Sequence, residues 1–308
     1  MGKEKSNAKL LKRIRQHSSL YLLLFIPMVF YITFKYIPIW NAQIAFKDYK
    51  AIDGLLGSKF TGLDNLESFI KGPYFFELMR NTIMYSFGKL VFYLPMSIAL
   101  AITIYETPHR KLGKFAQTLA YLPHFMSWVI IYGILLSLLA PGDGVINDII
   151  KFFGGKPIDF LSSTTAFPWV VILSDCWKEM GWSAIIFIAA LMGIDVSLFE
   201  AAMVEGASCW QRVRYITLPS IRPVLMVVLL LKIGTILDAG FNQIFMLYSP
   251  QVFSVADIID TWVYRQGLLE FNFSLATAVG LFKGLIGMTL ILLSNALVSR
   301  MDEGSTLI

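Results

Sequence analysis

Charged residues are scarce in this sequence, and their scarcity excludes a soluble globular protein. They make up 15% of the 308 residues, whereas 56% are hydrophobic and the mean hydropathy is +0.64. A soluble domain of this length needs a polar exterior and does not hide so much apolar surface. The composition therefore predicts a protein whose apolar segments lie in a membrane.

Cysteine and histidine are also rare, with two residues of the first kind and three of the second. Cys176 falls in an apolar segment and Cys209 in a polar one, so we expect neither a disulfide framework nor a cysteine-ligated metal site. His17, His109 and His124 lie far apart in the sequence. We therefore expect no functional histidine cluster and no metal.

Sequence motifs of catalysis and of nucleotide binding are missing as well. The chain contains no Gly-x-x-x-x-Gly-Lys-Ser/Thr phosphate loop, no His-Glu-x-x-His and no Gly-x-Ser-x-Gly. We therefore expect that this chain is not an enzyme, that it does not hydrolyse ATP and that it binds no cofactor.

Long apolar runs are what the sequence does contain. A helix needs about 20 residues to cross the hydrocarbon core of a bilayer. Six segments are close to or above that length, namely residues 21–39, 82–105, 115–139, 167–192, 224–240 and 276–298. We expect an all-α integral membrane protein with six transmembrane helices.

The placement of lysine and arginine predicts which side of the membrane each loop faces. These residues are frequent in segment 1–20, near Lys111 and near Arg212, whereas the intervening loops mix both signs. We expect a basic cytoplasmic tail at 1–20, a six-span domain at 21–299 with a cytoplasmic loop at 195–220, and a cytoplasmic tail at 300–308. The first apolar run is too long for a signal peptide, so we expect a retained anchor. The net charge of +5 follows from this topology and does not indicate nucleic-acid binding.

The cytoplasmic loop is predicted to form two short helices joined by a glycine turn. Two stretches fit the capping box. In this motif the serine side chain accepts a hydrogen bond from a backbone amide of the first turn, and the side chain three residues later accepts one from the amide of the serine. The two stretches are Ser197-x-x-Glu200 and Ser208-x-x-Gln211. Gly206 offers the permissive backbone for a stop between the helices, and Pro219 is expected to end the second one.

A pattern of residues in this loop carries a family resemblance. Its members are Glu200, Ala201, Ala202, Glu205, Gly206, Ala207, Ile216, Leu218 and Pro219. They resemble the EAA loop of ABC-transporter permeases of the importer type, in which an Asp usually stands where this chain has Glu205. The resemblance implies the type I ABC importer permease fold and coupling of the loop to a cytoplasmic ABC ATPase dimer, which uses ATP and Mg. It also implies a second, homologous permease subunit.

A second resemblance covers the outer loop, at residues 241–248 (Phe-Asn-Gln-Ile-Phe-Met-Leu-Tyr) and 255–265. These segments resemble the oligosaccharide or polysaccharide permeases within the carbohydrate-uptake branch of the ABC importers. The resemblance implies an oligosaccharide substrate and an extracytoplasmic sugar-binding protein as partner. We also expect a short helix here, capped by Ser254 and ending near Gly267, with its apolar face on membrane lipids or on the other spans.

Polar residues within the spans are candidates for the substrate pathway. An ionisable residue at the bilayer centre costs about 2.5–3.5 kcal/mol on insertion scales, so it tends to face protein or water. The candidates are Asp175, Lys178, Glu179, Trp182, Asp238, Asn242 and Gln243. We expect the first four to share one helical face and Asp238 and Asn242 to share another. The alternative is that these groups pair with neighbouring helices or with the second permease subunit.

Glycines at small-residue spacing mark the last span. Gly280, Gly284 and Gly287 favour a face for close helix packing.

Two other classes of membrane protein are alternatives to an ABC permease. A secondary transporter or channel without an ATPase predicts paired inverted repeats with broken helices, and it gives no reason for the pattern in the loop 195–220. A membrane-embedded enzyme needs a convergent catalytic set, which the missing motifs do not supply. We interpret the chain as a permease subunit of a bacterial ABC importer for oligosaccharides, which lies in the cell membrane and forms half of the translocation pathway.

Overall fold

The computed structural model describes residues 16–299. Residues 1–15, which carry most of the expected basic tail, and the expected tail 300–308 lie outside the described residues. The first part of the described chain contains α2 (Ser18–Tyr31), the π-helical turn η1 (Ile32–Tyr36), α3 (Ile37–Ile39), the 3-10 helix η2 (Trp40–Phe46), β1 (Lys47–Asp48), α4 (Gly54–Gly57), β2 (Lys59–Phe60), α5 (Asp64–Ile70), α6 (Phe75–Glu106), α7 (Arg110–Tyr121), the 3-10 helix η3 (Leu122–Phe125), α8 (Trp128–Leu139) and α9 (Val145–Phe152).

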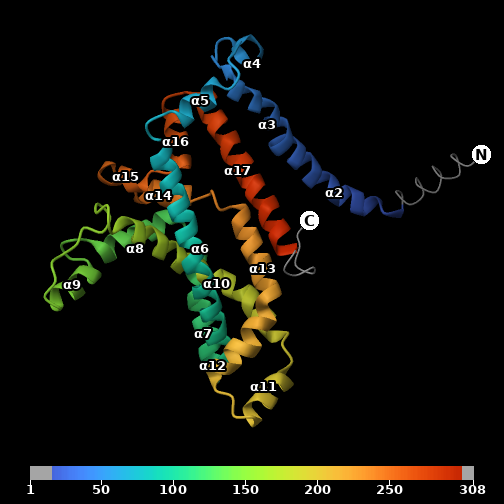
Figure 1. Cartoon of the computed structure of the whole chain (residues 1–308), viewed down its shortest axis with the longest axis vertical. Coiled ribbons are helices and arrows are strands. Elements are labelled where there is room, and N and C mark those ends of the chain that lie inside the picture. The colour runs from blue at the N-terminus through green and yellow to red at the C-terminus, as the bar shows by residue number, and fades with distance from the viewer. Residues whose placement is uncertain (1–15, 300–308) are drawn as a thin grey trace, which may run out of the picture.

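The second part contains the loop 195–220 and the last spans. Its elements are α10 (Phe167–Met192), α11 (Val196–Val204), α12 (Cys209–Arg212), the π-helical turn η4 (Val213–Thr217), α13 (Leu218–Gly234), α14 (Phe241–Leu247), the 3-10 helix η5 (Pro250–Val252), α15 (Phe253–Ala256), α16 (Ile259–Tyr264), the π-helical turn η6 (Arg265–Leu269) and α17 (Phe273–Ser299). The two strands form a small antiparallel pair, with Lys47 opposite Phe60. Figure 1 shows α6, α13 and α17 along the long axis, α11 at one end and α4 at the other.

The membrane-spanning helices follow from the apolar runs. Within residues 16–299, four helices are long and apolar enough to cross a membrane, and the number rises to six if each of two bent helix pairs is one span. The fourth predicted span, 167–192, coincides with α10. Segments 21–39, 82–105 and 276–298 lie inside longer helical stretches. The expectation of six spans is therefore met when each bent pair counts as one span.

The third predicted span, 115–139, is a bent pair of helices and not one straight helix. The chain bends by 108° between Lys111–Phe125 and Trp128–Leu139. Pro123 lies in the 3-10 turn η3 before the bend, and proline lacks the amide that a continuing helix uses. Ser127 then takes an extended conformation and its hydroxyl accepts from the Ile130 amide at 3.4 Å, which starts a new helix.

The fifth predicted span, 224–240, is wrong at both ends. The helix begins at Cys209, continues through η4 and α13, and ends at Gly234. Pro219 does not end it, contrary to expectation. It lies in the first turn of α13, directly after the π-helical turn η4, where the hydrogen-bond register shifts. A missing amide donor is tolerated at such a position.

The chain leaves the helix before Asp238, and the next helix, α14, starts after Gly240. Gly240 has φ +93°, a left-handed conformation that favours glycine. Asp238 and Asn242 therefore lie on different elements, and the expectation that they share a helical face is wrong.

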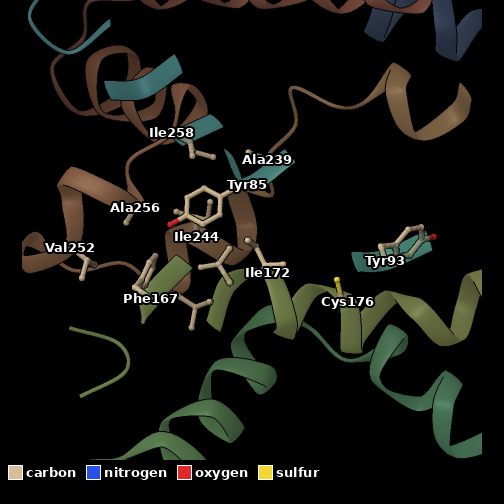
Figure 2. Close-up of a cluster of buried hydrophobic side chains, with 12 residues drawn as sticks. Tyr85, Tyr93, Phe167, Ile172, Cys176, Ala239, Ile244, Val252, Ala256 and Ile258 are labelled. Atoms are coloured by element: carbon tan, nitrogen blue, oxygen red, sulfur yellow. The ribbon is translucent and has the colours of Figure 1, made fainter. Parts of the chain in front are cut away.

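Helices α6 and α10 form the scaffold of the fold, because both contribute to the two larger buried clusters. The first cluster joins them to α14 and α15 through side chains such as Tyr85, Phe167 and Ile244, which converge in Figure 2. The second joins them to α13 near the loop 195–220, through Phe187 and Ile221 among others. A third cluster packs α5, α6, α16 and α17 together.

The short helix expected in the segment 255–265 is α16, and it packs on the spans. Ile258 and Ile259 are buried, and Trp262 packs against the third cluster. Ser254 does not cap this helix, because it lies within α15 and the chain is extended at Asp257. The helix continues as the π-helical turn η6 and ends at Leu269, close to the expected end near Gly267.

Helix α2 and the turns that follow it are exposed along their length. No residue from Ser18 to Ile39 is buried by the rest of the described chain, and Figure 1 shows this stretch diverging from the other helices. Its side chains are apolar, including Leu22, Leu23 and Ile26. Within a membrane such a surface is covered by lipid or by another protein.

Candidate functional site

The loop between α10 and α13 begins with a cap that the sequence did not predict. The carboxylate of Asp195 accepts from the Ser197 amide at 2.9 Å, so α11 starts one residue after Asp195. This backbone hydrogen bond lowers the pKa of the Asp195 carboxyl from its usual value. The expected box Ser197-x-x-Glu200 is therefore wrong. A charged acceptor two residues earlier suits a helix N-terminus better than the serine hydroxyl, and Glu200 is left exposed.

The glycine turn and the second capping box are confirmed. Gly206 has φ +79°, and the Ala207 amide donates to the carbonyl of Ala202 at 2.9 Å, which closes the end of α11. The Ser208 hydroxyl accepts from the Gln211 amide at 3.3 Å, and the Gln211 side chain accepts from the Ser208 amide at 2.7 Å. The two helices are thus held at a fixed angle by backbone hydrogen bonds.

The surface of this loop exposes large apolar side chains among its polar ones. Val204 is 90% exposed, Trp210 69% and Tyr215 71%. Figure 1 shows α11 at the extreme end of the molecule. Exposed apolar side chains grouped on a protruding loop are typical of a site for another protein. The EAA residues Glu200, Ala201, Ala202, Glu205, Gly206 and Ala207 lie on this protrusion, while Leu218 and Pro219 lie at the start of α13.

The loop is connected to two spans. Phe199 and Arg212 line a cavity of about 290 Å³ together with Tyr105 and Glu106, the last residues of α6. The helix that starts at Cys209 runs without interruption into the membrane as α13. The loop is therefore continuous with α13 and adjacent to the end of α6.

A buried polar network lies where α6, α10 and α14 meet. The ammonium group of Lys89 lies 3.2 Å from the Asp175 carboxylate, and it donates to the carbonyl of Ala239 at 2.9 Å and to the Gln243 side chain at 2.5 Å. Gln243 in turn donates to Ser174 at 2.9 Å. The turn at Gly240 lets Lys89 approach, because a Cβ there would collide with its ammonium group.

A cavity of about 220 Å³ adjoins this network. Its lining carries charged groups of both signs, a tyrosine and backbone from the turn after α13; the ionisable residues are Lys89, Tyr93, Asp175, Glu179, Lys232 and Asp238. The Lys232 ammonium lies 4.3 Å from the centre of the Tyr93 ring. Donors, acceptors and an aromatic ring in one cavity are what a polyhydroxylated ligand requires.

A second polar group holds the bend between α7 and α8. Glu179 accepts from His124 at 2.9 Å, and Lys178 donates to the carbonyl of His124 at 2.5 Å. The ring of Trp182 stacks on His124, with 4.6 Å between centroids. Lys178, which also lies 3.4 Å from the carbonyl of Pro123, thus pairs carbonyls that the break in the helix leaves open.

The structure divides the predicted pathway residues between two places. Asp175, Glu179 and Asp238 line the 220 Å³ cavity, and Gln243 is buried beneath it. Lys178 and Asn242 line a separate cavity of about 450 Å³. The single face expected for the fourth span is therefore split between the cavity and the bend.

Two residues of these networks were not predicted from the sequence. Lys89 lies in the second predicted span, and the rule that an ionisable residue inside a span is functional would have found it. His124 was not predicted to be functional, because no other histidine is near it in the sequence. Its partners are Glu179 and Trp182 from another helix, which a search for histidine clusters does not detect.

The glycines of α17 do not pack against this chain. No described atom lies within 4 Å of where a Cβ would stand on Gly280, Gly284 or Gly287. They line a cavity of about 550 Å³ with Lys283 and Asp238 among others. The expected close packing is therefore not found among residues 16–299.

Comparisons with known proteins agree with this geometry. The family described as "Binding-protein-dependent transport system inner membrane component" matches residues 93–304. The polygalacturonan/rhamnogalacturonan transport system permease protein of Bacillus subtilis (strain 168) is 40% identical, over 98% of this chain and 94% of its own length. The lactose transport system permease protein of Rhizobium radiobacter is 30% identical over 54% of this chain and 56% of its own length.

Solved structures resemble the fold over nearly the whole chain. A bacterial ABC transporter involved in the import of the acidic polysaccharide alginate matches with a TM-score of 0.87 and 34% identity, over 95% of this chain and 99% of that one. A bacterial alginate ABC transporter in complex with an alginate pentasaccharide-bound periplasmic protein matches with a TM-score of 0.86 and 35% identity, over 94% of this chain and 97% of that one.

Proposed function

The chain belongs to the family of binding-protein-dependent transport system inner membrane components, and from that premise we propose that it forms half of the translocation pathway of an ABC importer for oligosaccharides. The geometry of the loop 195–220 carries the proposal. Its two capped helices expose Val204, Trp210 and Tyr215 at one end of the molecule and continue directly into a span. A partner that binds such a loop and moves can shift the membrane helices with it.

The partner at this loop is an ABC ATPase dimer, which supplies the energy from ATP and Mg. The residues that couple to it are Glu200, Ala201, Ala202, Glu205, Gly206, Ala207, Leu218 and Pro219. The loop then faces the cytoplasm, and both termini lie on the same side. Lys111, Arg212 and Arg214 are all at this end of the helices, as the positive-inside rule requires.

Two further partners complete the transporter. A second, homologous permease subunit supplies the other half of the pathway, and the exposed stretch from Ser18 to Ile39 offers it an apolar surface. An extracytoplasmic binding protein delivers the oligosaccharide at the opposite end, where α4, α5 and α16 lie (Figure 1). The relative complexed with a sugar-bound periplasmic protein supports this arrangement.

The sugar passes along the cavity lined by Tyr93, Asp175, Glu179, Lys232 and Asp238. Asp175 is paired with Lys89, and Glu179 with His124. Among the described residues, no carboxylate lies close enough to the Lys232 ammonium, within 4 Å, to form an ion pair. The ammonium faces the Tyr93 ring instead. A cation without a carboxylate partner suits the carboxylate of a uronic acid, and Asp238 suits sugar hydroxyls.

We infer that the substrates are oligosaccharides that contain uronic acids. Two relatives that cover almost the whole chain support this, since they belong to systems for polygalacturonan or rhamnogalacturonan and for the acidic polysaccharide alginate.

Uptake by the assembled transporter tests the proposal. Proteoliposomes with this chain, its partner permease, the ATPase and the binding protein are given an acidic and a neutral trisaccharide. We expect ATP-dependent uptake of the acidic sugar, several-fold slower in Lys232→Gln and largely restored in Lys232→Arg. If Lys232→Gln slows the uptake of neither sugar, Lys232 does not contact the substrate. If the neutral sugar alone is transported, the substrate class is wrong.

A further inference from the structure

The short helix α9, at the end of α10 opposite to the loop 195–220, is anchored to neighbouring loops by residues of its polar side. Asn147 is fully buried, and its side chain donates to the carbonyls of Ala140 at 2.9 Å and Ile158 at 3.0 Å. It also accepts from the Ile158 amide at 2.8 Å. On the same side, Lys151 donates to the carbonyl of Gly142. These bonds fix the rotation of the helix.

The apolar side of α9 is turned outward as a consequence. Val145 is 53% exposed, Ile149 50%, Phe152 84% and the following residue Phe153 81%. Their spacing of four, three and one puts them on one helical face. The charged side chains of Asp148 and Lys151 are exposed beside this face, at 59% and 39%. α9 therefore presents an exposed apolar face next to a charged edge, as an amphipathic helix at a membrane interface does.

The apolar face of α9 continues into the apolar surface of the spans. Ile146 lines a cavity of about 530 Å³ with Leu138 and Leu139 of α8 and with Trp169, Leu173 and Trp177 of α10. Trp169 is half exposed, and tryptophan is enriched where spans meet the membrane–water interface. Figure 1 shows α8 and α9 projecting together to one side of the bundle.

We propose that α9 binds the outer leaflet of the lipid bilayer, lying in the interface with Val145, Ile149, Phe152 and Phe153 among the acyl chains. Helices of this type bury their apolar face about 5–10 Å into the boundary between headgroups and acyl chains. Lipid is the occupant because the face extends the membrane-exposed surface of α8 and α10 without a polar break. The contact fixes the depth and the tilt of α8, and so the position of the bend at residues 122–127.

Fluorescence quenching in the assembled transporter tests this. Phe152→Cys and the control Lys151→Cys, on the polar side of the same helix with Asn147, are made in a Cys209→Ser background; Cys176 is buried. Each is labelled with the environment-sensitive dye NBD and placed in nanodiscs of ordinary or acyl-brominated phosphatidylcholine and phosphatidylglycerol. Iodide serves as the quencher from water.

We expect brominated lipid to quench the dye at position 152 several-fold more than at position 151, and iodide to show the reverse order. Equal quenching of both positions by iodide would mean that α9 stands in water, which overturns the proposal. Protection of position 152 from both quenchers would also overturn it, because the face would then be covered by a partner protein.

Discussion

Replacing Gly206 with alanine isolates the backbone geometry on which coupling depends. Gly206 has φ +79°, and a Cβ added there meets nothing within 4 Å. The substitution therefore changes no contact and only penalises the left-handed conformation, by about 1–2 kcal/mol. Since about 1.4 kcal/mol is tenfold in an equilibrium, the population of the native turn relative to alternatives falls by about 5- to 30-fold.

The assay is uptake per ATP hydrolysed in proteoliposomes that contain the complete transporter and saturating binding protein. We expect Gly206→Ala to lower this ratio while the amount of assembled complex is unchanged, because the turn lies outside the buried clusters. Gly206→Asn should lower it less, since asparagine tolerates the left-handed region better than alanine does. Gly206→Asp and Glu200→Lys are expected to uncouple in the same assay.

Gly193→Ala is the matched control, at the other end of the same loop. Gly193 has φ −86°, an ordinary conformation for any residue, and its Cβ would lie at a normal 3.4 Å from the Ala190 carbonyl. We expect this variant to transport like the wild type. If Gly206→Ala also transports like the wild type, or if Gly193→Ala is equally impaired, the left-handed turn is not what coupling requires.

Three further predictions address the pathway and the topology. Lys89→Met leaves the Asp175 carboxylate without its partner in an ion pair whose two side chains are 11% and 21% exposed. Removing one partner of a buried pair costs about 3–5 kcal/mol, so the yield of monodisperse protein on size-exclusion chromatography should fall. The yield should recover in Lys89→Met/Asp175→Asn, and no recovery would assign Lys89 another role. Trp182 and Asn242 lie outside the cavity of about 220 Å³, so Trp182→Ala and Asn242→Ala should leave uptake per assembled complex unchanged, and Trp182→Ala should lower the amount of complex because its stack on His124 is lost. A several-fold loss of uptake per complex would instead place these side chains in the sugar path. In the Cys209→Ser background, cysteines at Lys111 or Gln211 should react with a membrane-impermeant reagent only in opened cells and cysteines at Asp53 or Lys156 in intact cells; the reverse pattern would overturn the orientation.

Features that depend on neighbouring residues in the chain were predictable from the sequence. The apolar run of 26 residues gives α10 the bounds that were expected, because length and hydropathy decide a span. Gly206 and the box Ser208-x-x-Gln211 were found because a left-handed turn and a reciprocal cap each need particular residues at fixed spacing.

Features that depend on contacts between distant segments were not predictable in this way. The bend at Pro123 is supported by Lys178 and Glu179 of another helix, so the apolar run 115–139 gave no sign of it. Asp195 and Ser197 both suit a cap, and only the position of the turn after α10 decides between them. Lys89 finds its partners at Asp175 and Ala239, which are far away in sequence.

The dependence of transport on the ATPase tests the central claim most directly. The chain and its partner permease are reconstituted with the binding protein, with and without the ATPase, and accumulation of a radiolabelled acidic oligosaccharide is measured. The account predicts accumulation against a gradient only when the ATPase and ATP-Mg are present, and its loss when the loop 195–220 is disrupted by Gly206→Asp. Accumulation without the ATPase, driven by an ion gradient, would contradict the account and would identify the chain as a secondary transporter.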